Sequence, residues 1–185
     1  MLAEAWEEKG GKIATDSFRD RRIDYGAEVP MAVRLLTMTV DVQHDRLEYS
    51  VKGWGPGRSS CLVAYGKVSG SPVQPETWQE LEMHRVRVFR KADGSEMRIA
   101  GTGLDTGDGT FSSEVYAYVG RHRSQRVFAL KGSSNPAAPP LPRRPTRNNK
   151  ARISLCGAGV IAIKSTVFGW LKLTQPGPGY VFFPA

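Results

Sequence analysis

Two aspartates occupy positions in the chain where a carboxylate can do chemistry. Asp41 lies in the apolar run LTMTVDV, and Asp105 ends the run MRIAGTGLD, which is followed by TGDG. A charge set into an apolar strand costs free energy unless a partner compensates it, and a metal ion is such a partner. If the two strands are neighbours, they lie about 4.8 Å apart and their carboxylates converge. We therefore expect the pair to bind a hard divalent cation such as Mg²⁺, which prefers carboxylate oxygen.

Both aspartates also have a purely structural interpretation. Asp41 would cap the turn that follows at His44 and Asp45, and Asp105 would form an Asx-turn through Gly107. The spacing of the residues leaves this alternative open.

Hydrophobic alternation and turn residues predict the elements that position these aspartates. Strands are predicted over residues 33–42, 47–54 and 60–65, joined by turns at 44–45 and 55–57 as an antiparallel meander. Further strands are predicted over 85–89, 97–104, 126–130, 153–156 and 180–183, and helices over 77–84, 112–121 and 161–173. This order predicts an α/β fold with a mixed central sheet, its first three strands antiparallel, flanked by helices.

Two segments depart from this pattern. Residues 1–30 contain a short helix-prone stretch, two adjacent glycines and a polar run, which predict a linker or domain edge before a domain of residues 31–185. Residues 132–150 are rich in Pro, Ser and Arg and predict a mobile basic loop.

The charge is distributed unevenly along the chain. No Asp or Glu follows Glu114, while residues 115–185 carry 11 Lys and Arg; the first 114 residues carry 15 basic and 18 acidic residues. A region of one sign suits a polyanion, and nucleic acid is the common one. A solvated basic surface without a ligand is the alternative.

The cysteines, the histidines and the length of the apolar runs bear on the compartment in which the protein is expected. Cys61 and Cys156 lie far apart in apolar runs, and neither they nor the three histidines have the spacing of a zinc site. No apolar run approaches the roughly 20 residues of a membrane span. We therefore expect a cytoplasmic protein with free thiols and no membrane partner.

Several sequence blocks together resemble one family. The runs VPMAVRLLTMTVDVQHDRLEYSVKGWG, GLDTGDGTFSSEVYAYV, RVFALKGSS and GPGYVFFP resemble the C-terminal nuclease of the large terminase subunit of lambda-type tailed phages, the GpA family. The resemblance extends from about Arg21 to Ala185. No GxxxxGK[ST] motif is present, so the chain is expected to follow the ATPase motor of such a protein.

The resemblance implies an RNase H-like fold and a metal-dependent endonuclease that cuts concatemeric double-stranded viral DNA. It implies that Asp41 and Asp105 are catalytic and hold two Mg²⁺ or Mn²⁺ ions, with Asp41 bridging them. Lys131 in ALKG matches a family lysine, for which contact with the scissile phosphate and simple solvent exposure are the alternatives. The resemblance also implies a small terminase subunit and a portal protein as partners of the full-length protein, in the cytoplasm of the infected bacterial host.

DNA backbone contacts are assigned from charge, since Lys and Arg neutralise phosphates without reading sequence. The residues so assigned are Arg121, Arg123, Arg143, Arg144, Arg147 and Lys150.

The chain departs from the family pattern in its acids. The block DTGDG adds Asp108 as a candidate metal ligand, and GVIAIKS places Ile161 and Ser165 where relatives carry acids. We expect the domain to be truncated at its C-terminus and a third ligand to come from sequence after Ala185. Asp45, Asp108 or Glu114 as the ligand, or a site without a third ligand, are the alternatives. A DNA-binding or docking domain that is inert in isolation is the alternative function, followed by a ribonuclease or resolvase on the same fold.

Overall fold

The structure, a computed structural model, describes residues 16–107, 109–148 and 153–185. Its strands are β1 (Arg22–Ile23), β2 (Leu35–Val42), β3 (Arg46–Trp54), β4 (Ser60–Ser69), β5 (Phe89–Arg90), β6 (Glu96–Met97), β7 (Ile99–Asp105), β8 (Val127–Ser133), β9 (Thr146–Asn148), β10 (Ile153–Gly159) and β11 (Val181–Pro184). Its helices are α1 (Asp16–Arg19), α2 (Pro75–Val86), α3 (Ser112–Arg121) and α4 (Val160–Leu171), with 3₁₀ turns η1 (Pro56–Arg58) and η2 (Arg123–Gln125).

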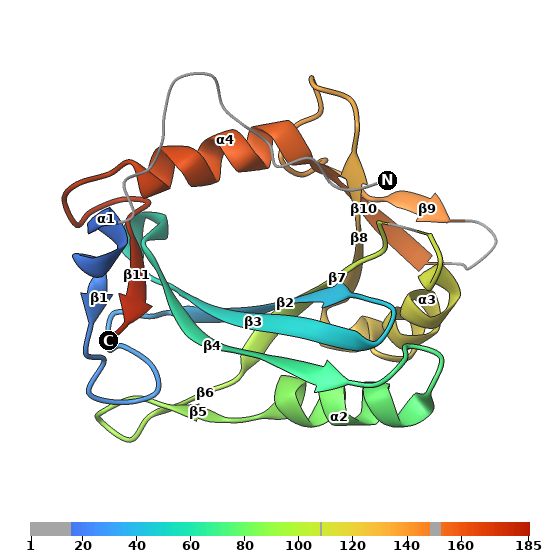
Figure 1. Cartoon of the computed structure of the whole chain (residues 1–185), viewed down its shortest axis with the longest axis horizontal. Helices are drawn as coiled ribbons and strands as arrows, with labels where there is room; N and C mark the ends of the chain where they lie inside the picture. Colours follow the sequence, from blue (N-terminus) through green and yellow to red (C-terminus); the bar gives the residue numbers. More distant parts are fainter. Residues whose placement is uncertain (1–15, 108, 149–152) are drawn as a thin grey trace.

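Nine strands form one mixed sheet in the order β1-β11-β4-β3-β2-β7-β8-β10-β9 (Figure 1). Strands β2, β3 and β4 form an antiparallel meander, and β7, β8 and β10 follow in parallel from β2. In the order β4-β3-β2-β7-β8, β3 alone runs against the other four, which is the RNase H-like arrangement. The predicted fold class, a mixed α/β sheet with three antiparallel strands first, is confirmed.

The two faces of the sheet differ in what covers them. In β2, Leu36, Met38 and Val40 are buried, whereas Thr39 and Asp41, which alternate with them, are exposed, because successive side chains of a strand point to opposite faces. Helices α2 and α3 pack on the face that carries the buried residues. Helix α4 runs along the other side, and none of its residues is buried (Figure 1). The second face, which we call the open face, is therefore largely uncovered.

The N-terminal segment forms one edge of this sheet. Strand β1 pairs with β11, and Arg21 just before it is 1% exposed. The Arg21 guanidinium donates to the carbonyls of Leu171 at 2.7 Å and Leu173 at 2.5 Å and stacks over the Tyr180 ring at 4.5 Å. It thereby satisfies carbonyl groups at the C-terminal end of α4. Val29 is also buried, so the described part of this segment packs against the sheet; whether residues 1–30 are a linker stays a prediction.

Two predicted elements are wrong in part. Residues 85 and 86 end helix α2 instead of starting a strand, because Arg85 is held by Glu82 one turn earlier in the helix. The predicted loop 132–150 contains a strand, β9, which pairs antiparallel with β10 and forms the edge of the sheet. Backbone pairing with β10 overrides the loop-forming composition there.

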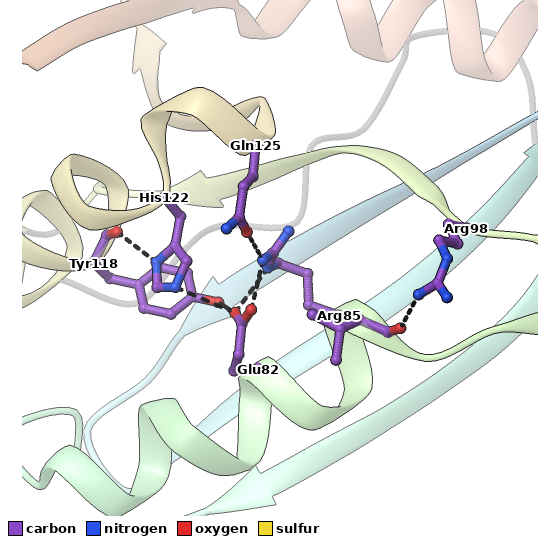
Figure 2. A network of polar contacts seen from close by, with 7 residues as sticks. Glu82, Arg85, Arg98, Tyr118, His122 and Gln125 are labelled. Atoms are coloured by element: carbon purple, nitrogen blue, oxygen red, sulfur yellow. Dashed lines mark hydrogen bonds and ion pairs between the residues drawn. The ribbon is translucent and has the colours of Figure 1, made fainter.

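A polar network joins α2 to α3 on the covered face (Figure 2). The Glu82 carboxylate accepts a hydrogen bond from Tyr118 Oη at 2.5 Å and pairs with Arg85 at 2.5 Å. His122 Nε2 lies 3.6 Å from the same carboxylate, and Arg85 also donates to Gln125. The network fixes α3, whose N-terminal end lies beside the candidate site.

The network sets the ionisation of its central acid. Burial alone would raise the pKa of Glu82, but hydrogen bonds from Arg85 and Tyr118 hold it below its ordinary value of 4.5. Burial raises the pKa of Tyr118, and the Glu82 carboxylate raises it further. A carboxylate whose pKa is lowered by folding stabilises the native state above its unfolded pKa, and that stability is lost as pH falls through the folded pKa.

Replacing Glu82 with Gln should therefore lower the free energy of unfolding at pH 7 by about 1–3 kcal/mol, since the Arg85 charge loses its partner. Chemical denaturation at several pH values measures this. The wild-type protein should lose stability between about pH 5 and pH 3 more steeply than the Glu82→Gln variant.

Glu80→Gln is the matched control, because Glu80 is exposed on the same helix. An equal loss of stability in both variants would show that the network does not hold α2 and α3 together.

Candidate active site

The register of β2 and β7 brings the two aspartates together. Thr39 pairs with Gly103 and Val40 with Leu104, so the next residue of each parallel strand places Asp41 beside Asp105. Both residues lie at the C-terminal ends of their strands, on the open face. Adjacent strands are about 4.8 Å apart, which allows one ligand to contact both carboxylates.

Asp41 is exposed, so the premise that it is a charge buried in an apolar strand is wrong. The buried residues of β2 point to the covered face, and Asp41 points to the open one. Its Oδ2 accepts a hydrogen bond from Gln43 Nε2 at 2.5 Å. This contact orients the carboxylate without neutralising its charge.

The turn after β7 holds Asp105 in place. Thr106 is 5% exposed and donates from both its backbone N–H and its hydroxyl to the Leu130 carbonyl, at 2.9 Å and 2.8 Å. Gly107 follows, and a Cβ there would lie 3.1 Å from Asp105 Oδ2. The sequence Asp-Thr-Gly therefore anchors the turn to β8 and keeps side-chain atoms away from the carboxylate.

Three adjoining hollows meet at the aspartates. A cavity of about 170 Å³ is lined by Asp41, Asp105 and the start of α3 at Phe111 and Ser112. A second, of about 460 Å³, contains both aspartates and extends over β3 and β4. A third, of about 600 Å³, extends from Asp105 to the start of α4 at Ile161. The aspartates thus lie where the open face is hollowed.

Glu48 is a third carboxylate of this region that sequence reasoning missed. It is the direct cross-strand partner of Asp41 and lines the second cavity with both aspartates. Its Oε1 is paired with Arg46 Nε at 2.6 Å. The signal was available in the hairpin, since a turn at residues 43–45 sets Glu48 opposite Asp41 on the same face.

Two of the other predicted ligands, Asp45 and Glu114, make contacts of their own. Asp45 lies in the turn and pairs with Arg46 at 2.8 Å, and Glu114 in α3 accepts a hydrogen bond from Ser113. Asp108 lies outside the described residues. Within the described ranges, no three His, Cys, Asp or Glu side chains gather closely enough to hold a metal ion.

The arrangement nevertheless suits hard divalent cations. Mg²⁺ is commonly bound through one or two carboxylates, with water and substrate phosphates completing its shell. Asp41 and Asp105 supply two exposed carboxylates in one hollow, which is such a donor set. Their roles as catalytic and metal-binding residues stay predictions.

Lys131 lies one residue beyond Leu130, which pairs with Asp105. Alternation along β8 places its exposed side chain toward the face opposite to Asp105. Arg121 and Arg123 lie at the C-terminal end of α3, whereas the start of that helix lines the cavity of the aspartates. The structure therefore does not gather these three cations around the acid pair.

The remaining predicted cations lie toward the β9 edge. Arg143 and Arg144 precede β9, and Arg147 lies within it; all three are exposed. Lys150 lies outside the described residues. Three strand spacings, about 14 Å, separate β9 from β7 and its Asp105.

No helix in the described parts of the chain is long and apolar enough to cross a membrane; α2 and α4 have 12 residues each.

Comparison with known proteins places this site in a family. The family model of the terminase large subunit gpA endonuclease domain matches residues 1–185. The chain is 32% identical to the terminase large subunit of Escherichia phage lambda over 188 residues, which cover 99% of this chain and 29% of that protein. It is 33% identical to the terminase large subunit of Enterobacteria phage P21 over 178 residues, which cover 96% of this chain and 27% of that protein.

Among solved structures, Thermus thermophilus RuvC in complex with Holliday junction substrate matches with a TM-score of 0.34 and 15% identity, over 53% of this chain and 64% of that chain. The two sequence relatives and the family match over the whole chain carry the assignment. The chain belongs to the terminase large subunit gpA endonuclease domain family.

Proposed function

We propose that this domain is a metal-dependent endonuclease that cleaves concatemeric double-stranded viral DNA during genome packaging, with two Mg²⁺ or Mn²⁺ ions. The observation that carries the proposal is the placement of Asp41 beside Asp105 on the open face of the sheet. Membership of an endonuclease family supports the reaction class.

Divalent ions bound at such a site would activate the attacking water and stabilise the leaving oxygen. The chain itself supplies the carboxylates of Asp41 and Asp105 and holds them in position. Gln43 orients the first carboxylate, and Thr106 anchors the turn that carries the second. Glu48 lines the same cavity, so it is our candidate for a further ligand once its pairing with Arg46 is broken.

The alternative function is a DNA-binding or docking domain that is inert in isolation. It is favoured by the lack of a three-ligand cluster within residues 16–107, 109–148 and 153–185. A nicking assay with Mg²⁺ or Mn²⁺ separates the two functions, since only the nuclease converts supercoiled plasmid to the open form.

The assembly of the full-length protein is also a proposal, because this chain spans under a third of the length of its phage relatives. We propose that double-stranded viral DNA is the substrate, and that the small terminase subunit and the portal protein are partners. The setting would be the cytoplasm of the infected bacterial host.

Replacing either aspartate of the pair with Asn should abolish plasmid nicking, a loss of at least about 100-fold, because a carboxylate that holds the ion is removed. The Glu48→Gln variant should retain partial activity and need more metal if Glu48 is a further ligand. Nicking rates across a Mg²⁺ and Mn²⁺ titration measure both effects.

Asp93→Asn is the control, since Asp93 lies in the β5–β6 turn and contacts Ser95. Full activity in Asp41→Asn or Asp105→Asn, with folding verified by circular dichroism, would refute the assignment of the active site.

The affinity for duplex DNA should fall steeply as the salt concentration rises, because we expect the arginines near β9 to bind DNA phosphates. Neutralising Arg143, Arg144 and Arg147 together should flatten the slope of log affinity against log salt by up to about 3 units, since each lost phosphate contact is worth about 0.9. Fluorescence anisotropy with labelled duplexes of two unrelated sequences measures the slope. Arg90→Gln at β5 is the control, and an unchanged slope in the triple variant would mean that these arginines are only solvated.

A further inference from the structure

One row of side chains crosses the open face next to the acid pair. Each residue of the row is paired with its neighbour in the adjacent strand. The exception is Ser154 beside Phe128, each of which lies one residue before the paired residues Leu155 and Ala129. The row consists of Tyr65, Ser50, Thr39, Gly103, Phe128, Ser154 and Arg147. It lies two residues, about 7 Å, along the strands from Asp41 and Asp105. A ligand cut at the acids must therefore lie close to this row.

Two aromatic rings rise from the row into solvent. Tyr65 is 75% exposed and Phe128 is 43% exposed, although both lie within strands of the sheet. Between them lie the hydroxyls of Thr39 and Ser50, which bond to each other at 2.8 Å, and the Leu130 side chain, whose Cδ1 would lie 2.6 Å from a Cβ on Gly103. Single exposed apolar residues are common on protein surfaces. These two rings are distinguished by their position on one row beside the candidate active site.

Helix α4 adds apolar surface on the same side of the sheet. Its sequence, VIAIKSTVFGWL, is mostly apolar and lacks an acid, yet none of its residues is buried. At its start, Val160 and Ile161 line a cavity of about 600 Å³ with Leu130 of β8. The helix and the open face thus leave apolar surface uncovered.

The acid pair and Glu48 lie on one side of the row, and cations lie at its end and on its other side. Arg147 lies at one end of the row and is exposed. Lys52 lies two residues after Ser50 on the same face; burial lowers its pKa, and its ammonium lies 5.4 Å from the Trp54 ring centre. In the described ranges no carboxylate is ion-paired with Lys52. Aromatic platforms beside cations are the features that bind single-stranded nucleic acid.

We propose that this row, with Lys52, binds an unpaired DNA strand whose bases stack on Tyr65 and Phe128 and whose phosphates contact Lys52 and Arg147. The inference rests on the proposed nuclease function and specifies its substrate, a duplex opened where it meets the domain. Bases inside an intact duplex are stacked on one another and offer no free faces to these rings. The two rings are four strand spacings, about 19 Å, apart, so they contact different nucleotides.

The test compares a fluorescein-labelled oligothymidine of about 16 nucleotides with a duplex of equal length, by anisotropy at one fixed salt concentration in EDTA, where no cleavage occurs. The wild-type chain should bind the single strand more tightly. Tyr65→Ala and Phe128→Ala should each weaken single-strand binding about 5- to 100-fold and leave duplex binding nearly unchanged.

Two further variants make the result specific to stacking. Tyr65→Phe keeps the ring and should bind like the wild type. Met83→Ala removes an apolar side chain of similar exposure, 65%, from α2 on the opposite side of the sheet, and should have no effect. Equal affinity for single strand and duplex, or unchanged binding in both alanine variants, would overturn the proposal and leave this face to a protein partner.

The test is independent of cleavage. If the chain fails to nick plasmid under any metal condition but binds the oligothymidine through Tyr65 and Phe128, the nuclease proposal fails and the strand-binding face stands. If it nicks plasmid but the alanine variants bind as the wild type does, only this inference fails.

Discussion

The parallel pairing of β2 with β7 is the constraint on which the site depends. Because Val40 pairs with Leu104, the residues that follow, Asp41 and Asp105, emerge side by side on one face. A slip of one residue in this register would send one carboxylate to the covered face. The buried residues of both strands prevent such a slip, since it would expose Val40 or Leu104 to water.

Because side chains alternate along each strand, the two faces of the sheet have different roles. The covered face carries the hydrophobic core and the Glu82 network, which fixes α3 and hence the wall of the smaller cavity. The open face is free for a ligand because α4 runs along it without burying its own residues. Arg21 holds the C-terminal end of α4 against the β1–β11 edge, so the N-terminal segment supports the same side of the molecule.

The sequence predicted the mixed sheet, the meander and the strands that carry both aspartates, because alternation and turn residues are local signals. It missed Glu48, whose place depends on cross-strand pairing, and the row from Tyr65 to Arg147, which combines strands far apart in the chain. It misjudged β9, since pairing with β10 outweighs a loop-like composition. The supposed burial of Asp41 was wrong because alternation exposes every second residue of β2.

The most direct test of the account is to locate a bound metal. Crystals soaked in Mn²⁺ and measured at its absorption edge should show an anomalous peak about 2.1 Å from carboxylate oxygens of both Asp41 and Asp105, near the distance typical of hard divalent ions. The account would be contradicted by an anomalous peak only elsewhere on the domain. It would also be contradicted by the absence of a peak at Asp41 and Asp105 in crystals of a protein that nicks DNA with Mn²⁺.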